Sequence, residues 1–108
     1  MTTLSTHVLD TELGKPAAGV AVALYVADNL LAQAETNADG RIPDLVGTPL
    51  AAGSYRIAFD VADYFRAQGR AAPFLERVSI DFRVTASDAH YHIPLLLSPY
   101  ACTSYRGS

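Results

Sequence analysis

The feature that most constrains the fold is a set of short segments in which apolar residues alternate with small or polar ones. In the clearest, Gly19 to Ala27, every second residue from Val20 to Val26 is a branched aliphatic. Successive side chains of a β-strand point to opposite faces, so this period of two predicts a strand with one buried face. The same alternation recurs over residues 54–61 and 77–85. Strands therefore dominate the predicted structure.

Turn residues separate these segments at intervals of roughly ten residues, without the strand–helix alternation of a parallel sheet. Apolar residues fall at helical spacing only over about Ala62–Gln68, and Gly69 suits the end of a helix. We therefore predict an all-β fold, a two-sheet antiparallel β-sandwich with one short helix, formed by 1–108 as a single domain. Further strands are predicted over 30–36, 41–42, 90–97 and about 101–106, a first strand around His7, and a turn at Ala86-Ser87-Asp88.

Composition excludes several classes of function. Half of the 108 residues are apolar, and the net charge of -3 offers no basic surface for nucleic acid. No segment has the apolar length of a membrane span or the pattern of a signal peptide. The only cysteine, Cys102, cannot form an intrachain disulfide. We therefore expect a cytoplasmic protein without a nucleic-acid or membrane partner.

The three histidines are the natural candidates for proton transfer or metal ligation. His90 and His92 are two residues apart in a predicted strand, so both should project from the same face. With His7 they could form a metal-free catalytic group or a zinc site. The plainer alternative is that His90 and His92 are a surface pair and His7 a hydrogen-bonded strand residue. Spacing alone leaves these alternatives open.

The segment Ser104-Tyr105-Arg106-Gly107-Ser108 follows the last predicted strand directly. Such a tail is usually disordered, but this one is rich in hydrogen-bonding groups and could instead dock so that its polar groups line a site. Periodicity does not decide between the two.

Four motifs in order, spread over nearly the whole chain, resemble the 5-hydroxyisourate hydrolases of the transthyretin-like family. A closing Tyr105-Arg106-Gly107-Ser108 makes the resemblance specific, because transthyretin itself lacks this ending. The four motifs are Leu4-Ser5-Thr6-His7-Val8-Leu9-Asp10-Thr11, Gly14-Lys15-Pro16-Ala17, Thr36-Asn37-Ala38-Asp39-Gly40-Arg41 and His90-Tyr91-His92-Ile93-Pro94-Leu95-Leu96-Leu97-Ser98-Pro99-Tyr100.

The resemblance implies a transthyretin-like sandwich that assembles as a homotetramer, a dimer of dimers, with active sites in the channel between dimers. It places the catalytic residues at His7, Arg41, His92 and Ser108, with no cofactor and no metal. It implies that Arg41, Tyr105 and Ser108 bind the substrate, whereas His90 is structural or supports the site. The sequence departs from the family at Cys102, where relatives commonly carry an aromatic residue.

The implied reaction is the hydrolysis of 5-hydroxyisourate to 2-oxo-4-hydroxy-4-carboxy-5-ureidoimidazoline in urate degradation. An imidazole suits the removal of a proton from water, so His7 or His92 is the expected base. The planar guanidinium of Arg41 suits the negative charge that develops on the C6 carbonyl oxygen. Two alternatives remain: a carrier that binds a hydrophobic or aromatic ligand, which requires an apolar channel floor, and a zinc-dependent hydrolase that uses all three histidines.

Overall fold

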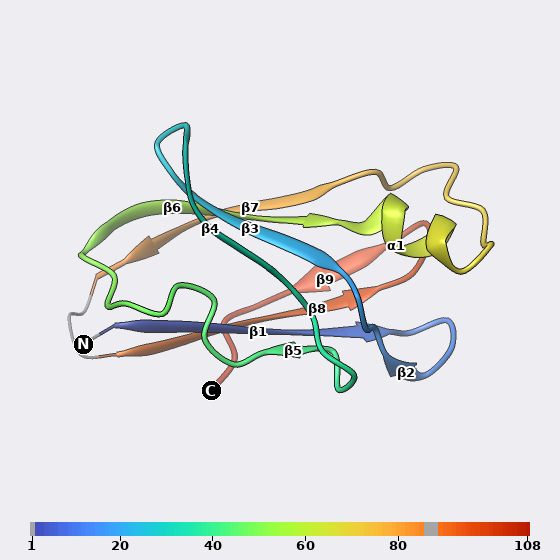
Figure 1. Ribbon diagram of the computed structural model, residues 1–108, viewed down its shortest axis with the longest axis horizontal. Coiled ribbons are helices and arrows are strands. Elements are labelled where there is room, and N and C mark those ends of the chain that lie inside the picture. Colours follow the sequence, from blue (N-terminus) through green and yellow to red (C-terminus); the bar gives the residue numbers. More distant parts are fainter. Residues whose placement is uncertain (1, 86–88) are drawn as a thin grey trace.

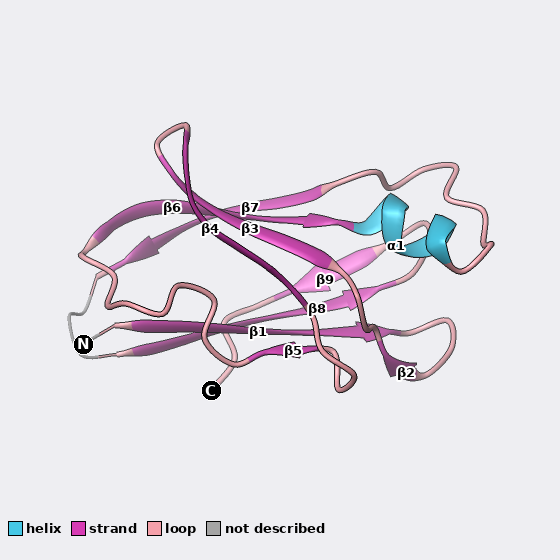
Figure 2. Ribbon diagram, in the orientation of Figure 1, coloured by secondary structure: helices cyan, strands magenta, loops and turns pink. Residues whose placement is uncertain are grey.

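The computed structural model describes residues 2–85 and 89–108, which form two β-sheets packed face to face (Figure 1). Sheet A contains β1 (Thr3–Asp10), β2 (Lys15–Pro16), β5 (Arg41–Ile42), β8 (His90–Leu97) and β9 (Cys102–Ser104). Sheet B contains β3 (Ala21–Val26), β4 (Asn29–Glu35), β6 (Gly53–Asp60) and β7 (Val78–Val84). The helix α1 (Val61–Ala67) lies at one end of the sandwich (Figure 2). Over the described residues, the predicted β-sandwich with one short helix is confirmed.

Among the described strands, pairing within the sheets is antiparallel with one exception. Sheet B has the order β4-β3-β6-β7, and sheet A has the order β2-β1-β8-β9, with β5 also paired to β1. The pair β1 and β8 is parallel over its whole length, from Thr3 opposite His90 to Asp10 opposite Leu97. The prediction of an antiparallel sandwich is wrong for this pair. The two strands come from opposite ends of the chain, and their apolar pattern does not indicate whether they pair parallel or antiparallel.

The core consists of the inward faces of the two sheets. In β6 and the start of α1, Tyr55, Ile57, Phe59 and Val61 are all buried, as their alternation predicts. The predicted inward face of β3 holds only in part, because Val26 is 37% exposed. It lies near the turn between β3 and β4, which projects away from sheet A in Figure 1. The predicted turn at Ala86-Ser87-Asp88 lies outside the described residues.

The helix α1 begins at Val61, one residue before the predicted start, and ends at Ala67, one residue before the predicted end. It buries Val61, Ala62, Tyr64 and Phe65.

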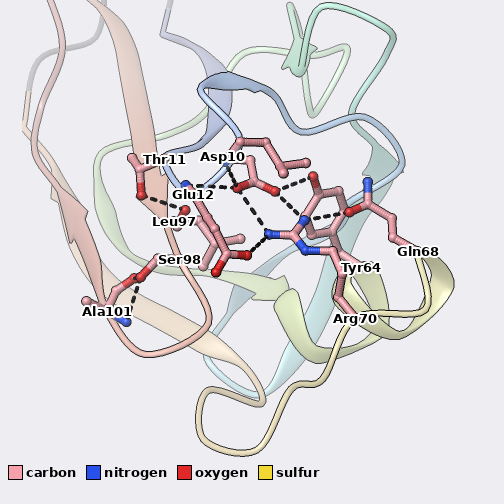
Figure 3. Close-up of polar contacts among 10 residues, drawn as sticks. Asp10, Thr11, Glu12, Tyr64, Gln68, Arg70, Leu97, Ser98 and Ala101 are labelled. Atoms are coloured by element: carbon pink, nitrogen blue, oxygen red, sulfur yellow. Dashed lines mark hydrogen bonds and ion pairs between the residues drawn. The ribbon is translucent and has the colours of Figure 1, made fainter.

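A buried carboxylate ties the end of β1 to the segment after α1 (Figure 3). Asp10 is fully buried and accepts hydrogen bonds from Arg70 at 2.6 Å, from the Tyr64 hydroxyl at 2.8 Å, and from the backbone N–H of Glu12 and Leu13 at 3.1 Å. Burial alone would raise the pKa of Asp10, but the bonds from Arg70, Tyr64 and Leu13 outweigh it and lower that pKa. The ion pair between Asp10 and Arg70 therefore fixes the end of β1, the strand that carries His7.

Candidate active site

The outward face of sheet A carries the candidate catalytic side chains. In β1, Leu4, Thr6 and Val8 are buried in the core, so the alternation of the strand turns Ser5 and His7 outward. In β8, buried Tyr91 and Ile93 alternate with the outward-facing His90 and His92. The parallel register sets Ser5 opposite His92. The histidines of the first and last motifs thus come to one surface.

Arg41 reaches this surface through a tight turn. The side-chain oxygen of Asn37 accepts hydrogen bonds from the backbone N–H of Asp39 at 2.9 Å and of Arg41 at 3.0 Å. Gly40 has a positive φ of 74°, and a Cβ there would lie 2.5 Å from the carbonyl oxygen of Val8. β5 then pairs with β1 so that Arg41 stands opposite His7. The predicted turn therefore positions Arg41.

The tail after β9 is docked rather than disordered, which decides between the two alternatives. The backbone N–H of Gly107 donates to the carbonyl oxygen of His92 at 2.7 Å, extending the pairing of β9 with β8. A Cβ at Gly107 would lie 2.5 Å from Cδ2 of the His92 ring, so only glycine fits this close approach. The guanidinium of Arg106 stacks over Tyr91, 4.1 Å from the ring centre. Figure 1 shows the C-terminus on the side of sheet A that faces away from sheet B.

These segments border an open cavity of about 350 Å³ on the outer face of sheet A. It is lined by Ser5, Thr6, Arg41, Pro43, His90, His92 and Ser108. Three of the predicted catalytic residues therefore share one cavity: Arg41, His92 and Ser108. His7 is not in its wall but lies close enough for its charge to act on His92.

Tyr105 lies elsewhere. It is 57% exposed and lines a second cavity, of about 310 Å³, at the edge of the sandwich. The walls of this second cavity are largely aromatic and aliphatic, with Ile80, Phe82, Tyr91 and Ile93 among them. The predicted binding residue Tyr105 is thus not among the residues that line the histidine cavity.

The histidine pair is held by hydroxyl groups. The Ser5 hydroxyl lies 2.8 Å from Nε2 of His90 and 2.8 Å from Nδ1 of His92. On its far side, His90 is hydrogen-bonded through Nδ1 to the hydroxyl of Thr3. His90 and His92 are therefore not a free surface pair, because each ring has a defined polar partner.

The surroundings favour the neutral form of both histidines near the cavity. Burial lowers the pKa of His7, and the positive charge of Arg41 lowers it further, whereas a backbone hydrogen bond and the charge of Asp39 partly oppose this. Burial also lowers the pKa of His92, followed by the charges of Arg41, His7 and His90, against a backbone hydrogen bond with Ser5. Neutral imidazoles are proton acceptors, so the site can take a proton from a bound molecule at neutral pH.

Four residues of the site were not predicted from the sequence. Ser5, Thr6 and Pro43 line the cavity, and the backbone of Asp39 contacts His7. Ser5 had a weak signal, since it is two residues before His7 and so on the same face of a strand. Its role depends on the pairing of β1 with β8, which the sequence does not reveal.

Within residues 2–85 and 89–108, no group of three His, Cys, Asp or Glu side chains is arranged to hold a metal ion. Among the same residues, no helix is long and apolar enough to cross a membrane.

Comparison with known proteins identifies the family. The family model described as HIUase/Transthyretin matches residues 4–107. The 5-hydroxyisourate hydrolase of Caulobacter vibrioides is 47% identical over 115 aligned residues, which cover 100% of both chains.

Solved structures agree with this assignment. The 5-hydroxyisourate hydrolase of Klebsiella pneumoniae has a TM-score of 0.92 and 42% identity, covering 100% of this chain and 94% of its own. Sea bream transthyretin, solved in complex with thyroxine, has a TM-score of 0.85 and 33% identity, covering 97% and 94% of the two chains. The chain therefore belongs to the HIUase/transthyretin family.

Proposed function

We propose that this protein is a hydrolase that opens the six-membered ring of 5-hydroxyisourate to give 2-oxo-4-hydroxy-4-carboxy-5-ureidoimidazoline. Full-length similarity to 5-hydroxyisourate hydrolases supports the substrate. The observation that carries the proposal is the polar cavity, in which His92, Arg41 and Ser108 stand together beside His7. These groups suit proton transfer and the binding of a planar, polar heterocycle.

In the proposed first step, a water oxygen bonds to the C6 carbonyl carbon while a neutral imidazole takes one of the water's protons. Either His7 or His92 suits this role, because each has a pKa below the ordinary value of 6.5. General base catalysis of this kind contributes about 100-fold to 10,000-fold. No covalent intermediate with the protein is needed.

Arg41 is assigned to the developing charge. As water adds to C6, the carbonyl oxygen becomes negative, and a guanidinium in the same cavity stabilises it more strongly than the neutral ground state. The planar fork of a guanidinium also matches the polar edge of the substrate ring.

The second step breaks the bond between C6 and N1. The departing nitrogen takes the proton that the imidazolium gained from water in the first step, handed over directly or through the second histidine, so both rings end neutral. C6 stays on the product as a carboxylic acid, which releases its proton to solvent and becomes a carboxylate. Ser108 lines the cavity, and we assign it the role of orienting the water or an imidazole. For Tyr105, which lines the neighbouring cavity, we assign a role in placing the tail.

The carrier alternative requires an apolar floor, whereas every residue that lines the histidine cavity except Pro43 has a polar or charged side chain. Assembly is also part of the proposal: a homotetramer, in which a second dimer would cover the outer face of sheet A and close the cavity. The proposal also includes a cytoplasmic location, which suits the free thiol of the exposed Cys102.

The test is to generate 5-hydroxyisourate from urate with urate oxidase and follow its near-ultraviolet decay with purified protein. We expect decay faster than the spontaneous rate and the same after exhaustive chelation of metals. Decay at the spontaneous rate would refute the hydrolase and favour the carrier. Activity that disappears on chelation and returns with zinc would instead support the zinc-dependent alternative.

A further inference from the structure

The two neutral tautomers of His92 differ in whether Nε2 accepts or donates a hydrogen bond in the cavity. A neutral imidazole carries one hydrogen, on Nδ1 or on Nε2. With the hydrogen on Nδ1, Nε2 can accept a proton from water, whereas with the hydrogen on Nε2 that nitrogen is a donor. The group bonded to one ring nitrogen sets the state of the other. In His92, Ser5 supplies such groups: its hydroxyl lies 2.8 Å from Nδ1, and its backbone also hydrogen-bonds the ring.

Ser5 is one member of a line of four side chains on the outer face of sheet A. Its hydroxyl also lies 2.8 Å from Nε2 of His90, and Nδ1 of His90 is hydrogen-bonded to Thr3. The parallel register holds the line together, because it sets Thr3 opposite His90 and Ser5 opposite His92. We call these four residues, Thr3, His90, Ser5 and His92, the hydroxyl–imidazole relay.

The relay has two directions. A hydroxyl has one hydrogen and two lone pairs, so Ser5 can donate to at most one of the two rings. The two directions are those in which it donates to one ring and accepts from the other. Each neutral ring also has one hydrogen, so the direction at Ser5 fixes both tautomers. In the first direction, Nδ1–H of His92 donates to Ser5, Ser5 donates to Nε2 of His90, and Nδ1–H of His90 donates to Thr3. In the second direction, every bond is reversed.

Arg41 favours the first direction. Its guanidinium lines the same cavity as His92 and acts on that ring with its positive charge. A nearby positive charge is attracted to a nitrogen lone pair and repelled by an N–H group, so it favours Nε2 without a hydrogen. The charge of Arg41 and the first direction of the relay therefore favour the same tautomer of His92, with the hydrogen on Nδ1.

We propose that Ser5 and His90 are positioning residues that hold His92 as the Nδ1–H tautomer, with Nε2 presented to the cavity as the proton acceptor. This inference rests on the proposed function and deepens it, because it makes His92 the base that takes the proton from water. Both residues also line the cavity, but the role proposed for them acts through the ring of His92.

The direct test is ¹⁵N NMR of the histidine rings in the full chain, at a pH where His92 is neutral. The spectrum distinguishes a protonated from an unprotonated ring nitrogen and does not depend on activity. We expect Nδ1–H at His92 in the wild type and a shift toward Nε2–H in Ser5→Ala. Ser5→Thr keeps the hydroxyl and should restore the wild-type state. Ser79→Ala, an exposed serine on β7 of the other sheet, is the matched control.

Kinetics give a second readout. Ser5→Ala should lower kcat about 10-fold to 100-fold, because the wrong tautomer cannot accept the proton. KM does not decide the question, because Ser5 also lines the cavity; the fall in kcat, taken together with the tautomer of His92, does. Ser5→Thr should recover most of kcat. A fall in kcat that Ser5→Thr fails to rescue, with the His92 tautomer unchanged, would overturn the proposal.

His90 provides an independent pair of variants at an exposed position, where folding is little affected. His90→Gln offers Ser5 an amide oxygen as acceptor and should keep the Nδ1–H tautomer of His92. His90→Phe offers Ser5 no acceptor, so His92 should shift away from the Nδ1–H tautomer. Equal spectra for these two variants would refute the relay. An inactive wild type would refute the hydrolase instead, so the two failures are distinguishable.

Discussion

Adding one methyl group at Gly107 should misplace His92 without unfolding the protein. In Gly107→Ala, the new Cβ would lie 2.5 Å from Cδ2 and 3.2 Å from Cγ of the His92 ring. Carbon atoms in contact normally lie about 3.5–4.0 Å apart, so the ring or the tail must move by roughly 1 Å. Either movement changes the distance between His92 and Ser108.

A displacement of about 1 Å at a catalytic group can cost roughly 100-fold in rate. We therefore expect kcat/KM of Gly107→Ala to fall about 100-fold in the 5-hydroxyisourate decay assay. The free energy of unfolding should change by less than about 0.5 kcal/mol, because Gly107 lies outside the core and its φ is not in the left-handed region.

Gly14→Ala is the matched control with the opposite expectation. Its added methyl meets nothing within 4 Å, but Gly14 has a φ of +68°, which costs an L-residue about 1 kcal/mol. This variant should lose about 4–8 °C in Tm while its kcat/KM stays at the wild-type value. Wild-type kcat/KM in Gly107→Ala would refute the role of the docked tail in placing His92.

Four further predictions concern charge. Arg41→Lys should lower kcat/KM about 100-fold by steady-state assay, because an ammonium lacks the planar fork, whereas Arg66→Lys on α1 should not. Since the pKa values of His7 and His92 are lowered, the plateau of kcat/KM should extend below pH 6.5. The two neutral histidines also contribute to the free energy of unfolding measured in urea. This contribution should be complete above pH 6.5 and be lost as the pH falls toward the lowered pKa values of the folded state. Arg70→Met should cost about 3 kcal/mol in the same urea assay, because buried Asp10 loses its cation. Arg66→Met, which breaks an exposed pair, should cost less than about 1 kcal/mol.

The fold was predictable wherever burial follows a period of two. Tyr55, Ile57 and Phe59 alternate with exposed or small residues and line the core as expected. Alternation states which face is buried but not the direction of the neighbouring strand, so the parallel pair of β1 and β8 was missed. It also does not state how far the facing sheet extends, so Val26 was assigned to the buried face although it lies near a hairpin that projects away from sheet A.

The candidate site was predictable in residue type and only partly in placement. The motifs supplied Arg41, His92 and Ser108, which share the cavity, and His7 beside it. The contacts that orient them depend on strand register: Ser5 reaches both rings of β8 only because it stands opposite His92. The Asp10–Arg70 pair was not predicted either, since 60 residues separate its members along the chain.

The most direct test of the central claim is where a purine analogue of the substrate binds. Urate, which the protein should bind without hydrolysing, can be titrated into isotope-labelled protein while backbone and ring resonances are followed by NMR. The proposed site predicts the largest shifts at Ser5, Arg41 and His92. Shifts centred instead on the second cavity, at Ile80 and Phe82, with His92 unmoved, would contradict the assignment of the polar cavity as the active site.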